Sequence, residues 1–423
     1  MRPPRILFVH DAFPGQFGAL GRWLAAEGWD VAFATAAPSA RADGFRLLRY
    51  APHRKPQPGT HPCAQPMDRA AINAQAFVRA ALAARRDGYR PDIVVAHSGW
   101  GAGMFARDVF PEAAFVAYCE WWYRHPGVDV AYLAALEGRP ASGAEAACHA
   151  APEGRAPAAG VEAAMHERAR NAPIAMDLAA SDAAICPTAF QAAQFPDVFR
   201  RHLGVLHDGV DADAFAPAPA AEPDTLDGLV APDARLVTYA TRGMEPHRGF
   251  PQFMAALPAI LAADPRAVAV IAGDNRVSYG GDAIRRVDWK ARALAEHDLD
   301  PTRVRFTGKL PRADYLRLLR RSDAHVYLTV PFVLSWSMVE AMSTGCALVL
   351  SDTAPVREFA DAEAAALVDL ARPAAIAGGV LATLADPAAA ARRRGRARET
   401  VLAGLTERQQ FPAKRALLAG LRG

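Results

Sequence analysis

Cysteine is scarce and scattered in this chain of 423 residues. The five cysteines stand at positions 63, 119, 148, 186 and 346, and no close pair has the spacing of a metal site. Their number is odd, which argues against a disulfide framework and is typical of reduced cytosolic proteins. We therefore expect a cytoplasmic protein, and a peripheral place at the inner face of the membrane stays open.

Long apolar runs and a strong charge of one sign are also missing. No stretch approaches 18 uninterrupted apolar residues, so no transmembrane helix is predicted. The first apolar run, Ile6–Val9, is too short for the core of a signal peptide. The formal net charge of +3 is too small for a general nucleic-acid binder. Basic clusters such as Arg392–Arg398 are interpreted as solvated helix faces, with a patch for anionic lipid or an anionic acceptor as the alternative.

What the chain does have is a regular alternation of short apolar runs and longer amphipathic segments. Runs rich in Val, Ile and Phe predict buried parallel strands, and the segments between them predict crossover helices. Hydrophobic residues make up 52% of the chain, enough for sizeable cores. The predicted strands are Ile6–Val9, Asp30–Ala34, Ile93–Ala96, Ala114–Tyr118, Ala183–Cys186 and Leu203–His207, then Leu236–Ala240, Ala267–Ala272, Val304–Phe306, Ala324–Leu328 and Ala347–Ser351.

The series of strands restarts near residue 235, after a linker at 217–233 that is rich in Pro, Ala and Asp. We predict an α/β protein with two doubly wound, Rossmann-like domains, residues 1–215 and 216–405. A last helix within 406–423 is expected to cross back to the first domain. The stretch 136–165 is rich in Ala, Gly, Pro and Glu, and it predicts a long mobile insertion in the first domain.

The strongest local pattern follows the predicted strand Leu236–Ala240. Arg242 and Arg248 stand six residues apart in the loop at its carboxyl end. That edge is where ligands bind in open α/β sheets. Arginine offers permanently charged, forked donors that suit phosphate. A phosphate site is therefore predicted, with a pair of surface arginines as the alternative.

A helix that follows the strand Ala324–Leu328 begins at the same edge. Ser335 or Ser337 is expected to cap this helix, and its free N–H groups suit a phosphate. Glu340 lies on the first turns, where its carboxylate could accept hydrogen bonds from a ribose diol. Gly345 is expected to end the helix.

In the first domain, residues with useful chemistry follow three strands. Gly15 and Gln16 lie in a glycine-containing loop before a helix, but the loop is not a GxGxxG dinucleotide fingerprint. His97 closes a second strand. Glu120 follows a third, where a carboxylate could stabilise positive charge or orient an acceptor hydroxyl. A structural histidine and a surface glutamate beside core aromatics are the alternatives.

Taken together, these motifs resemble the large family of retaining glycosyltransferases with the GT-B fold, of the bacterial group 1 or family 4 type. The resemblance covers nearly the whole chain. It rests on the segments Phe8–Phe17, Val205–Phe215, Arg242–Gly249, Gly308–Leu310, Phe332–Gly345 and Ser351–Glu358. It implies two domains that face each other across a cleft and a nucleoside diphosphate-sugar as the donor.

The resemblance also implies roles for individual residues. Arg242 matches the family's phosphate-binding arginine, Arg248 replaces the usual lysine, and Glu340 matches the glutamate that binds the donor ribose. Phe332 stands where the family has a further glutamate near the donor sugar, so contacts to that sugar must differ. The predicted site is Glu120, Arg242 and Arg248 as catalytic groups; Gly15, Gln16, Lys309, Leu310, Leu334, Ser335, Trp336, Ser337 and Glu340 at the donor; and His97 and Phe332 at the acceptor or sugar.

No metal and no cofactor are expected. Asp211-Ala212-Asp213 matches an Asp-x-Asp pattern, but it falls in an interdomain segment that is structural in the family. The arginines and the helix N-terminus can carry the charge of the leaving diphosphate. The predicted activity is retaining sugar transfer to a glycan, lipid-linked or small-molecule acceptor. A sugar-nucleotide epimerase of the same fold and a catalytically silent sugar-nucleotide-binding partner are the alternatives.

Overall fold

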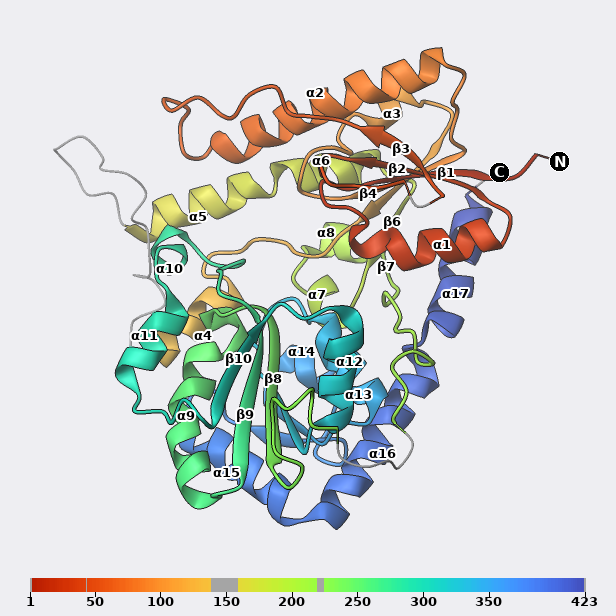
Figure 1. The fold of residues 1–423 in the computed structure, drawn as a ribbon. Coiled ribbons are helices and arrows are strands. Elements are labelled where there is room, and N and C mark those ends of the chain that lie inside the picture. The colour runs from red at the N-terminus through yellow and green to blue at the C-terminus, as the bar shows by residue number, and fades with distance from the viewer. Residues whose placement is uncertain (1, 43, 138–158, 219–223, 422–423) are drawn as a thin grey trace. The chain divides into compact units, whose positions relative to one another are not determined.

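The computed structural model describes residues 2–42, 44–137, 159–218 and 224–421, and these form two α/β units (Figure 1). The first unit takes in the described residues of Met1–Gly127, Ala146–Gly209 and Glu407–Gly423. The second takes in those of Val128–Glu145 and Val210–Thr406. The predicted α/β class with two doubly wound domains is confirmed. Residues 128–137 pack with the second unit, although they lie within the predicted first domain.

The described part of the first unit contains a parallel sheet of seven strands in the order β3-β2-β1-β4-β5-β6-β7. All six predicted strands of this domain are present. Strand β3, whose four residues are Arg-Leu-Leu-Arg, was not predicted, because charged ends and a short apolar run hide an edge strand. The strands are β1 Arg5–Val9, β2 Asp30–Thr35, β3 Arg46–Arg49, β4 Ile93–His97, β5 Ala114–Tyr118, β6 Ala183–Cys186 and β7 Leu203–Val205.

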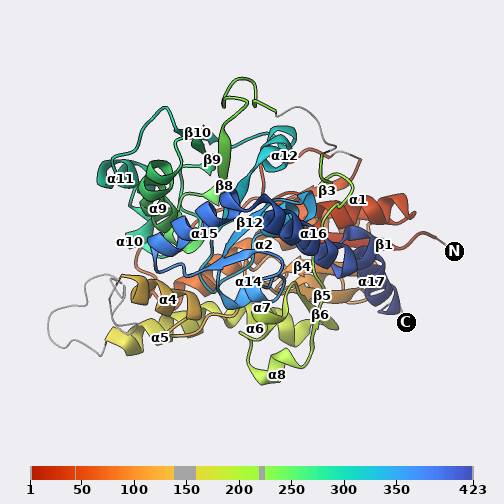
Figure 2. The same cartoon turned by 90° about the horizontal axis from the view of Figure 1, so that it is seen from below.

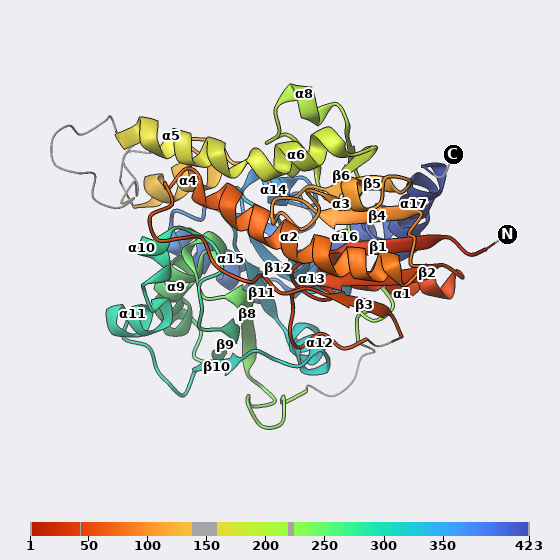
Figure 3. The same cartoon turned by 90° about the horizontal axis from the view of Figure 1, so that it is seen from above.

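Helices cover both faces of this sheet, which is why its central strands are apolar throughout. One face carries α2 (Gln65–Arg86), α3 (Ala106–Val109) and α6 (Ala172–Ala180). Figure 3 shows α2 along the same side as α5 (Ala159–Arg170) and α6. The other face carries α1 (Gly18–Ala26) and α17 (Glu407–Gly420). The short elements are η1 Gly15–Phe17, α7 Ala189–Ala192 and α8 Asp197–Arg200.

Buried contacts hold α17 on the first unit. Lys414 Nζ lies 3.1 Å from Asp208 Oδ1, and both side chains are almost fully buried. The hydroxyl of Tyr118, on β5, donates to the same carboxylate at 2.9 Å. The ring of Phe411 packs against Trp23 of α1, with centroids 5.8 Å apart. An ion pair and an aromatic contact thus anchor the C-terminal helix.

The second unit, as far as it is described, contains a parallel sheet of six strands in the order β10-β9-β8-β11-β12-β13. Five of the strands were predicted. β13 was missed because its run Ala-Leu-Val is only three residues long. The strands are β8 Arg235–Gly243, β9 Ala267–Asp274, β10 Val304–Gly308, β11 Ala324–Tyr327, β12 Leu348–Ser351 and β13 Ala366–Val368.

Helices also cover both faces of the second sheet. On one face, α9 (Phe250–Ala263) contacts α11 (Trp289–Glu296) and α15 (Pro373–Ala385), as Figure 2 also shows. On the other face lie α12 (Arg312–Arg321), α13 (Trp336–Thr344) and α16 (Pro387–Gly404). The short elements are η2 Pro246–Arg248, α10 Asp282–Arg285 and α14 Ala354–Arg357. No single described helix is long and apolar enough to cross a membrane, and only the α15–α16 pair, bent by 102°, passes that test together.

The predicted insertion at 136–165 is partly helical. Helix α4 spans Val128–Leu136, and α5 begins at Ala159. The mobility of the insertion stays a prediction: residues 159–165 are helical, and residues 138–158 lie outside the described part of the chain. Alanine and glutamate have high helix propensity, so their abundance did not distinguish a loop from a helix.

Candidate functional site

Each sheet has a point at which the strand order reverses. In the first, β1 is followed outward by β2 and β3, and the chain returns to place β4 on the other side of β1. In the second, β8 lies between β9 and β11 in the same way. In each sheet, the loops after the two strands at this point, β1 and β4 or β8 and β11, go to opposite faces of the sheet. Ligands of open α/β sheets bind in the crevice between these loops. Most of the predicted site residues follow β1, β4, β8 or β11.

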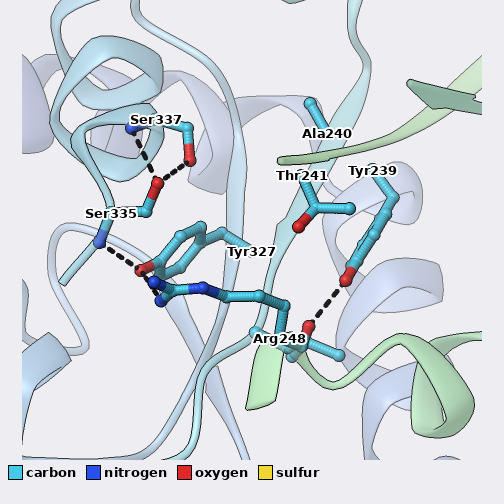
Figure 4. Close-up of a pocket in the computed structure, with 8 residues that line it drawn as sticks. Tyr239, Ala240, Thr241, Arg248, Tyr327, Ser335 and Ser337 are labelled. Carbon is cyan, nitrogen blue, oxygen red and sulfur yellow. Dashed lines mark hydrogen bonds between the residues drawn. The ribbon is translucent and has the colours of Figure 1, made fainter. Parts of the chain in front are cut away.

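A pocket lies at the β8–β11 crevice of the second unit (Figure 4). Residues of β8 and β11 form walls of this pocket, and the start of α13 contributes two serines. The lining residues are Tyr239, Ala240, Thr241, Arg248, Tyr327, Leu328, Ser335 and Ser337.

Arg248 is held rigidly in this pocket by the protein itself. Its side chain is 6% exposed, and Nη1 donates to Thr329 Oγ1 and to the Val333 carbonyl, both at 3.0 Å. Nη1 also lies 3.4 Å from the hydroxyl of Tyr327, as Figure 4 shows. Burial would lower the pKa of Arg248, but nearby Tyr327, Tyr279 and Glu245 keep it raised. A permanent positive charge is thus positioned before any ligand arrives.

The start of α13 lies beside this charge. Ser335 is the N-cap, as predicted, and its Oγ accepts a hydrogen bond from the backbone N–H of Ser337 at 3.4 Å. The N–H of Ser335 donates to the hydroxyl of Tyr327 at 2.9 Å. Gly345 ends the helix with φ = 75°, also as predicted. The positive end of the helix dipole therefore reinforces an anion site at the pocket.

Arg242 differs from Arg248 in its surroundings. It lies at the carboxyl end of β8 and is exposed to solvent. Among the described residues, its guanidinium has no hydrogen-bond or ion-pair partner. Its backbone carbonyl accepts a bond from Arg276 Nε at 3.5 Å. Arg242 is therefore a cation available to a ligand, whereas Arg248 is built into the pocket.

Two further predicted donor residues lie on α13. Glu340 Oε2 accepts a hydrogen bond from the hydroxyl of Tyr315 at 3.1 Å. Burial raises the pKa of Glu340, and the bond from Tyr315 and the charge of Arg312 oppose this shift. Trp336, at the first position of the helix, is 45% exposed.

Lys309 and Leu310 do not line the pocket. They follow β10, which is separated from β8 by β9. Lys309 is exposed, and Leu310 packs against the core around Val230 and Leu236. The resemblance that assigned them to the nucleotide base depends on a short motif, and the described pocket does not include them.

Phe332 and Leu334 take part in packing rather than in the pocket lining. The ring of Phe332 contacts His247 and Tyr279 edge-on, at centroid distances of 5.5 and 4.9 Å. Leu334 is buried in the core beneath α13. The ring of Tyr279 lies 5.2 Å from the guanidinium of Arg248. An aromatic cluster thus occupies the position where the family resemblance led us to expect a carboxylate.

The polar groups that hold this aromatic cluster were not among the predicted site residues. Glu245 is fully buried and accepts hydrogen bonds from the backbone N–H groups of Ser278 and Tyr279, at 2.5 and 2.9 Å. His247 Nε2 lies 3.5 Å from Asp129 Oδ2 of α4. Glu245 and His247 stand between the two arginines in the sequence. Their partners, Ser278, Tyr279 and Asp129, are distant in the chain, so no local pattern shows these contacts.

A second polar cluster lies at the β1–β4 crevice of the first unit. His97 Nε2 lies 3.2 Å from Glu120 Oε2, and Gln16 Nε2 donates to Glu120 Oε1 at 2.6 Å. His97 Nδ1 lies 3.1 Å from the carbonyl of Ser98. Gly15, at φ = 54°, brings the loop close to the ring of His10, where a Cβ would lie 3.0 Å from that ring. Four predicted residues from three separate segments therefore meet here.

The contacts of His97 indicate a charged pair. Both of its ring nitrogens face acceptors, which suits an imidazolium with two N–H groups. Burial would lower the pKa of His97, but the charge of Glu120 and their hydrogen bond raise it overall. Burial would raise the pKa of Glu120, yet His97 and the bond from Gln16 lower it overall. The carboxylate is thus kept ionised although it is only partly exposed to solvent.

Asp177 is a buried carboxylate beside this cluster that the sequence did not reveal. Its Oδ2 accepts a hydrogen bond from Ser98 Oγ at 2.8 Å, and its side chain is fully buried. Burial raises the pKa of Asp177 to about 7. It lies on α6, some eighty positions after His97, so no local pattern in the sequence points to it.

The aromatic run after Glu120 belongs to the packing. Trp122 lies against Phe195 and Phe199, with centroids 5.7 and 5.4 Å apart. The ring of Tyr123 lies 3.5 Å from the guanidinium of Arg170. Within the described ranges, no group of three or more His, Cys, Asp or Glu is placed to hold a metal ion.

Two family models match the chain. The model of the glycosyl transferase family 4 group matches residues 27–153 and 141–215, and the model of glycosyl transferases group 1 matches residues 234–386. A phosphatidyl-myo-inositol mannosyltransferase of Mycolicibacterium smegmatis is 31% identical over 186 residues, which cover 43% of this chain. The match spans only 42% of that relative's length.

Two solved structures show the same fold over nearly the whole chain. Sucrose-phosphate synthase from Thermosynechococcus elongatus superposes with a TM-score of 0.70 at 18% identity, over 99% of both chains. The Anabaena protein HepE, in complex with UDP and glucose, superposes with a TM-score of 0.66 at 15% identity, over 98% of this chain and 99% of its own. With two family models that follow one another along two doubly wound units, the chain is a GT-B fold glycosyltransferase of the group 1 and family 4 type.

Proposed function

We propose that the chain is a retaining glycosyltransferase that takes its sugar from a nucleoside diphosphate-sugar and needs no metal ion. The observation that carries this proposal is the pocket at the β8–β11 crevice. A preset guanidinium, a helix N-terminus and an exposed arginine lie on the same edge of one sheet there. A diphosphate carries two or three negative charges, and this edge offers cations and N–H donors to match them.

In the proposed reaction, the bond between C1 of the sugar and the diphosphate oxygen breaks. An acceptor oxygen bonds to the same face of C1, and the acceptor proton leaves with the diphosphate. Arg242, Arg248 and the start of α13 stabilise the charge that grows on the leaving group, which is the task a metal ion performs in other transferases. Glu340, on α13, is proposed to bind the ribose.

The cluster of the first unit is proposed to take the acceptor. An ionised Glu120, positioned by Gln16 and His97, can accept a hydrogen bond from an acceptor hydroxyl and orient it. The retention of configuration and the choice of donor rest on the family resemblance. HepE, which shares the fold, was crystallised with UDP-glucose.

Donor binding and turnover test the proposal in two stages. Thermal shifts with UDP-, GDP-, dTDP- and ADP-sugars identify the donor, because a ligand that binds only the native state raises the melting temperature. Release of nucleoside diphosphate is then followed with and without EDTA, and the coupling constant of the anomeric proton in the product reports its configuration. Turnover that is lost with EDTA and restored by a divalent ion would contradict metal independence, and an inverted product would contradict retention. Isomerised nucleotide-sugar as the sole product would identify an epimerase.

A further inference from the structure

One large apolar side chain at the carboxyl edge of the first sheet is exposed. Trp100 follows β4 by three residues, and its side chain is 52% exposed. Ser98 before it and Gly101–Met104 after it are buried. The indole therefore projects from a turn whose neighbouring residues in the sequence are mostly buried.

The backbone that presents Trp100 is rigid. Gly99 and Gly101 flank it with φ values of 93° and 92°, a region that favours glycine. A Cβ at Gly101 would lie 2.3 Å from the carbonyl oxygen of Ala70 on α2, so the turn is packed tightly against that helix. The carbonyl of Trp100 accepts a hydrogen bond from Nδ2 of Asn73, also on α2, at 2.9 Å.

Buried polar side chains anchor the turn from two further directions. The same Nδ2 of Asn73 donates to Asp11 Oδ2 at 2.8 Å, which ties the turn to the loop after β1. Asp177 of α6 accepts the hydroxyl hydrogen of Ser98 at 2.8 Å. A turn whose backbone is already fixed in place loses little backbone entropy when a ligand binds against it.

The indole lies next to the proposed acceptor cluster. Its centroid is 6.4 Å from that of His97, whose Nε2 contacts the carboxylate of Glu120. Trp100 follows β4, and Gln16 and His10 follow β1, so all of them flank the crevice where the strand order reverses. A molecule with one hydroxyl at Glu120 would have its body against the indole.

We propose that Trp100 is a stacking platform for the acceptor, and that the acceptor presents a six-membered polyol ring, a pyranoside or a cyclitol. The C–H face of such a ring packs on the indole, while its hydroxyls reach the carboxylate of Glu120. An open-chain alcohol has no flat C–H face to offer. The acceptor role rests on the proposed function, but recognition of the ring does not.

Binding of small probes tests recognition without catalysis. Saturation-transfer NMR is recorded with methyl α-glucopyranoside, methyl α-mannopyranoside, myo-inositol and the open-chain polyol glucitol. We expect the wild type to bind at least one ring compound and to bind glucitol at least ten-fold more weakly. Trp100→Ala weakens ring binding about ten-fold, Trp100→Phe less, and Leu82→Ala, which removes another exposed apolar side chain of the same unit, leaves it unchanged. The pyranosides and myo-inositol together distinguish a sugar from a cyclitol.

Transfer kinetics then place the ring in the reaction. For a ring acceptor, Trp100→Ala raises KM about ten-fold, equivalent to about 1.4 kcal/mol, and lowers kcat less than three-fold. Melting temperatures check that each variant is folded. Ring binding by a wild type that releases no nucleoside diphosphate from any donor would refute the proposed function and still support the platform.

Two results would overturn the inference. One is equal binding of glucitol and the ring compounds by the wild type. The other is unaltered ring affinity in a folded Trp100→Ala variant that has lost binding to phosphatidylcholine–phosphatidylglycerol vesicles, which would assign the indole to a membrane surface.

Discussion

Arg242 and Arg248 form a matched pair for separating binding from stability. Both are predicted to carry the diphosphate, but one is exposed and the other is built into the second unit. Arg242→Ala removes a side chain that has no partner among the described residues, so the free energy of unfolding should change by less than about 0.5 kcal/mol. Arg248→Ala removes three hydrogen bonds and should also destabilise the unit.

The size of the second effect follows from the partners of Arg248. Hydrogen bonds to a charged group contribute about 1.5–3 kcal/mol each. Thr329 Oγ1 keeps a bond to the carbonyl of Val330, and the hydroxyl of Tyr327 keeps the N–H of Ser335. Removal of the buried cation also ends its own desolvation cost. We therefore expect a net loss of about 3 kcal/mol, less than the sum of three bonds.

Urea denaturation and donor binding measure the two effects. Both variants should lose nucleotide-sugar binding by at least ten-fold, and only Arg248→Ala should unfold at a clearly lower urea concentration. Arg248→Lys keeps the charge but loses the planar fork, so it should recover part of the binding and little of the stability. The reasoning is refuted if Arg248→Ala is as stable as Arg242→Ala.

Three other outcomes are expected. Burial is the largest influence on the pKa of His97 and lowers it, and the charge of Glu120 is the largest of those that raise it, so in Glu120→Gln the His97 pKa should fall below 6.5 in an NMR titration; an unchanged value would contradict the ion pair. His325 is fully buried, and burial lowers its pKa to about 4. Between pH 6.5 and pH 4 only the unfolded chain binds a proton at this histidine, so the free energy of unfolding should fall by on the order of 3 kcal/mol as the pH is lowered. The urea midpoint of the wild type should therefore shift with pH more than that of His325→Asn. Gly101→Ala should destabilise by more than about 2 kcal/mol, and Gly88→Ala, at φ = 84° with open space around it, by about 1 kcal/mol; equal melting temperatures would contradict the tight packing at Gly101.

The parallel strands were predictable because burial on both faces leaves a signal in the sequence. Runs such as Ile6–Val9 and Ala267–Ala272 are apolar at every position, and all eleven predicted strands are present. The missed strands, β3 and β13, lie at sheet edges, where fewer positions are buried. The helix at 159–165 was not predicted because a stretch rich in alanine and glutamate was interpreted as a loop, although both residues favour helices.

The placement of candidate site residues at a sheet edge was predictable where they follow a strand that was itself predicted. Arg248, Ser335, His97 and Glu120 all lie at such ends, and the parallel topology brings them to one edge of each sheet. Lys309 also follows a strand, but that strand is at the outer edge of its sheet, away from the pocket. The position of a residue at a strand end therefore indicated whether it lies near the pocket only once the order of the strands in the sheet was known.

The amino-acid sequence by itself determined the α/β class, the two-domain division and the residue types offered to a diphosphate, because periodicity and local motifs are properties of neighbouring residues. Only the tertiary structure decided what those residues do to one another. It buried Arg248 and left Arg242 exposed, paired His97 with Glu120, and placed Asp177 and Asn73 beneath the turn that presents Trp100. Burial, charge pairing and rigidity depend on groups that are distant in the chain, and only folding brings those groups together.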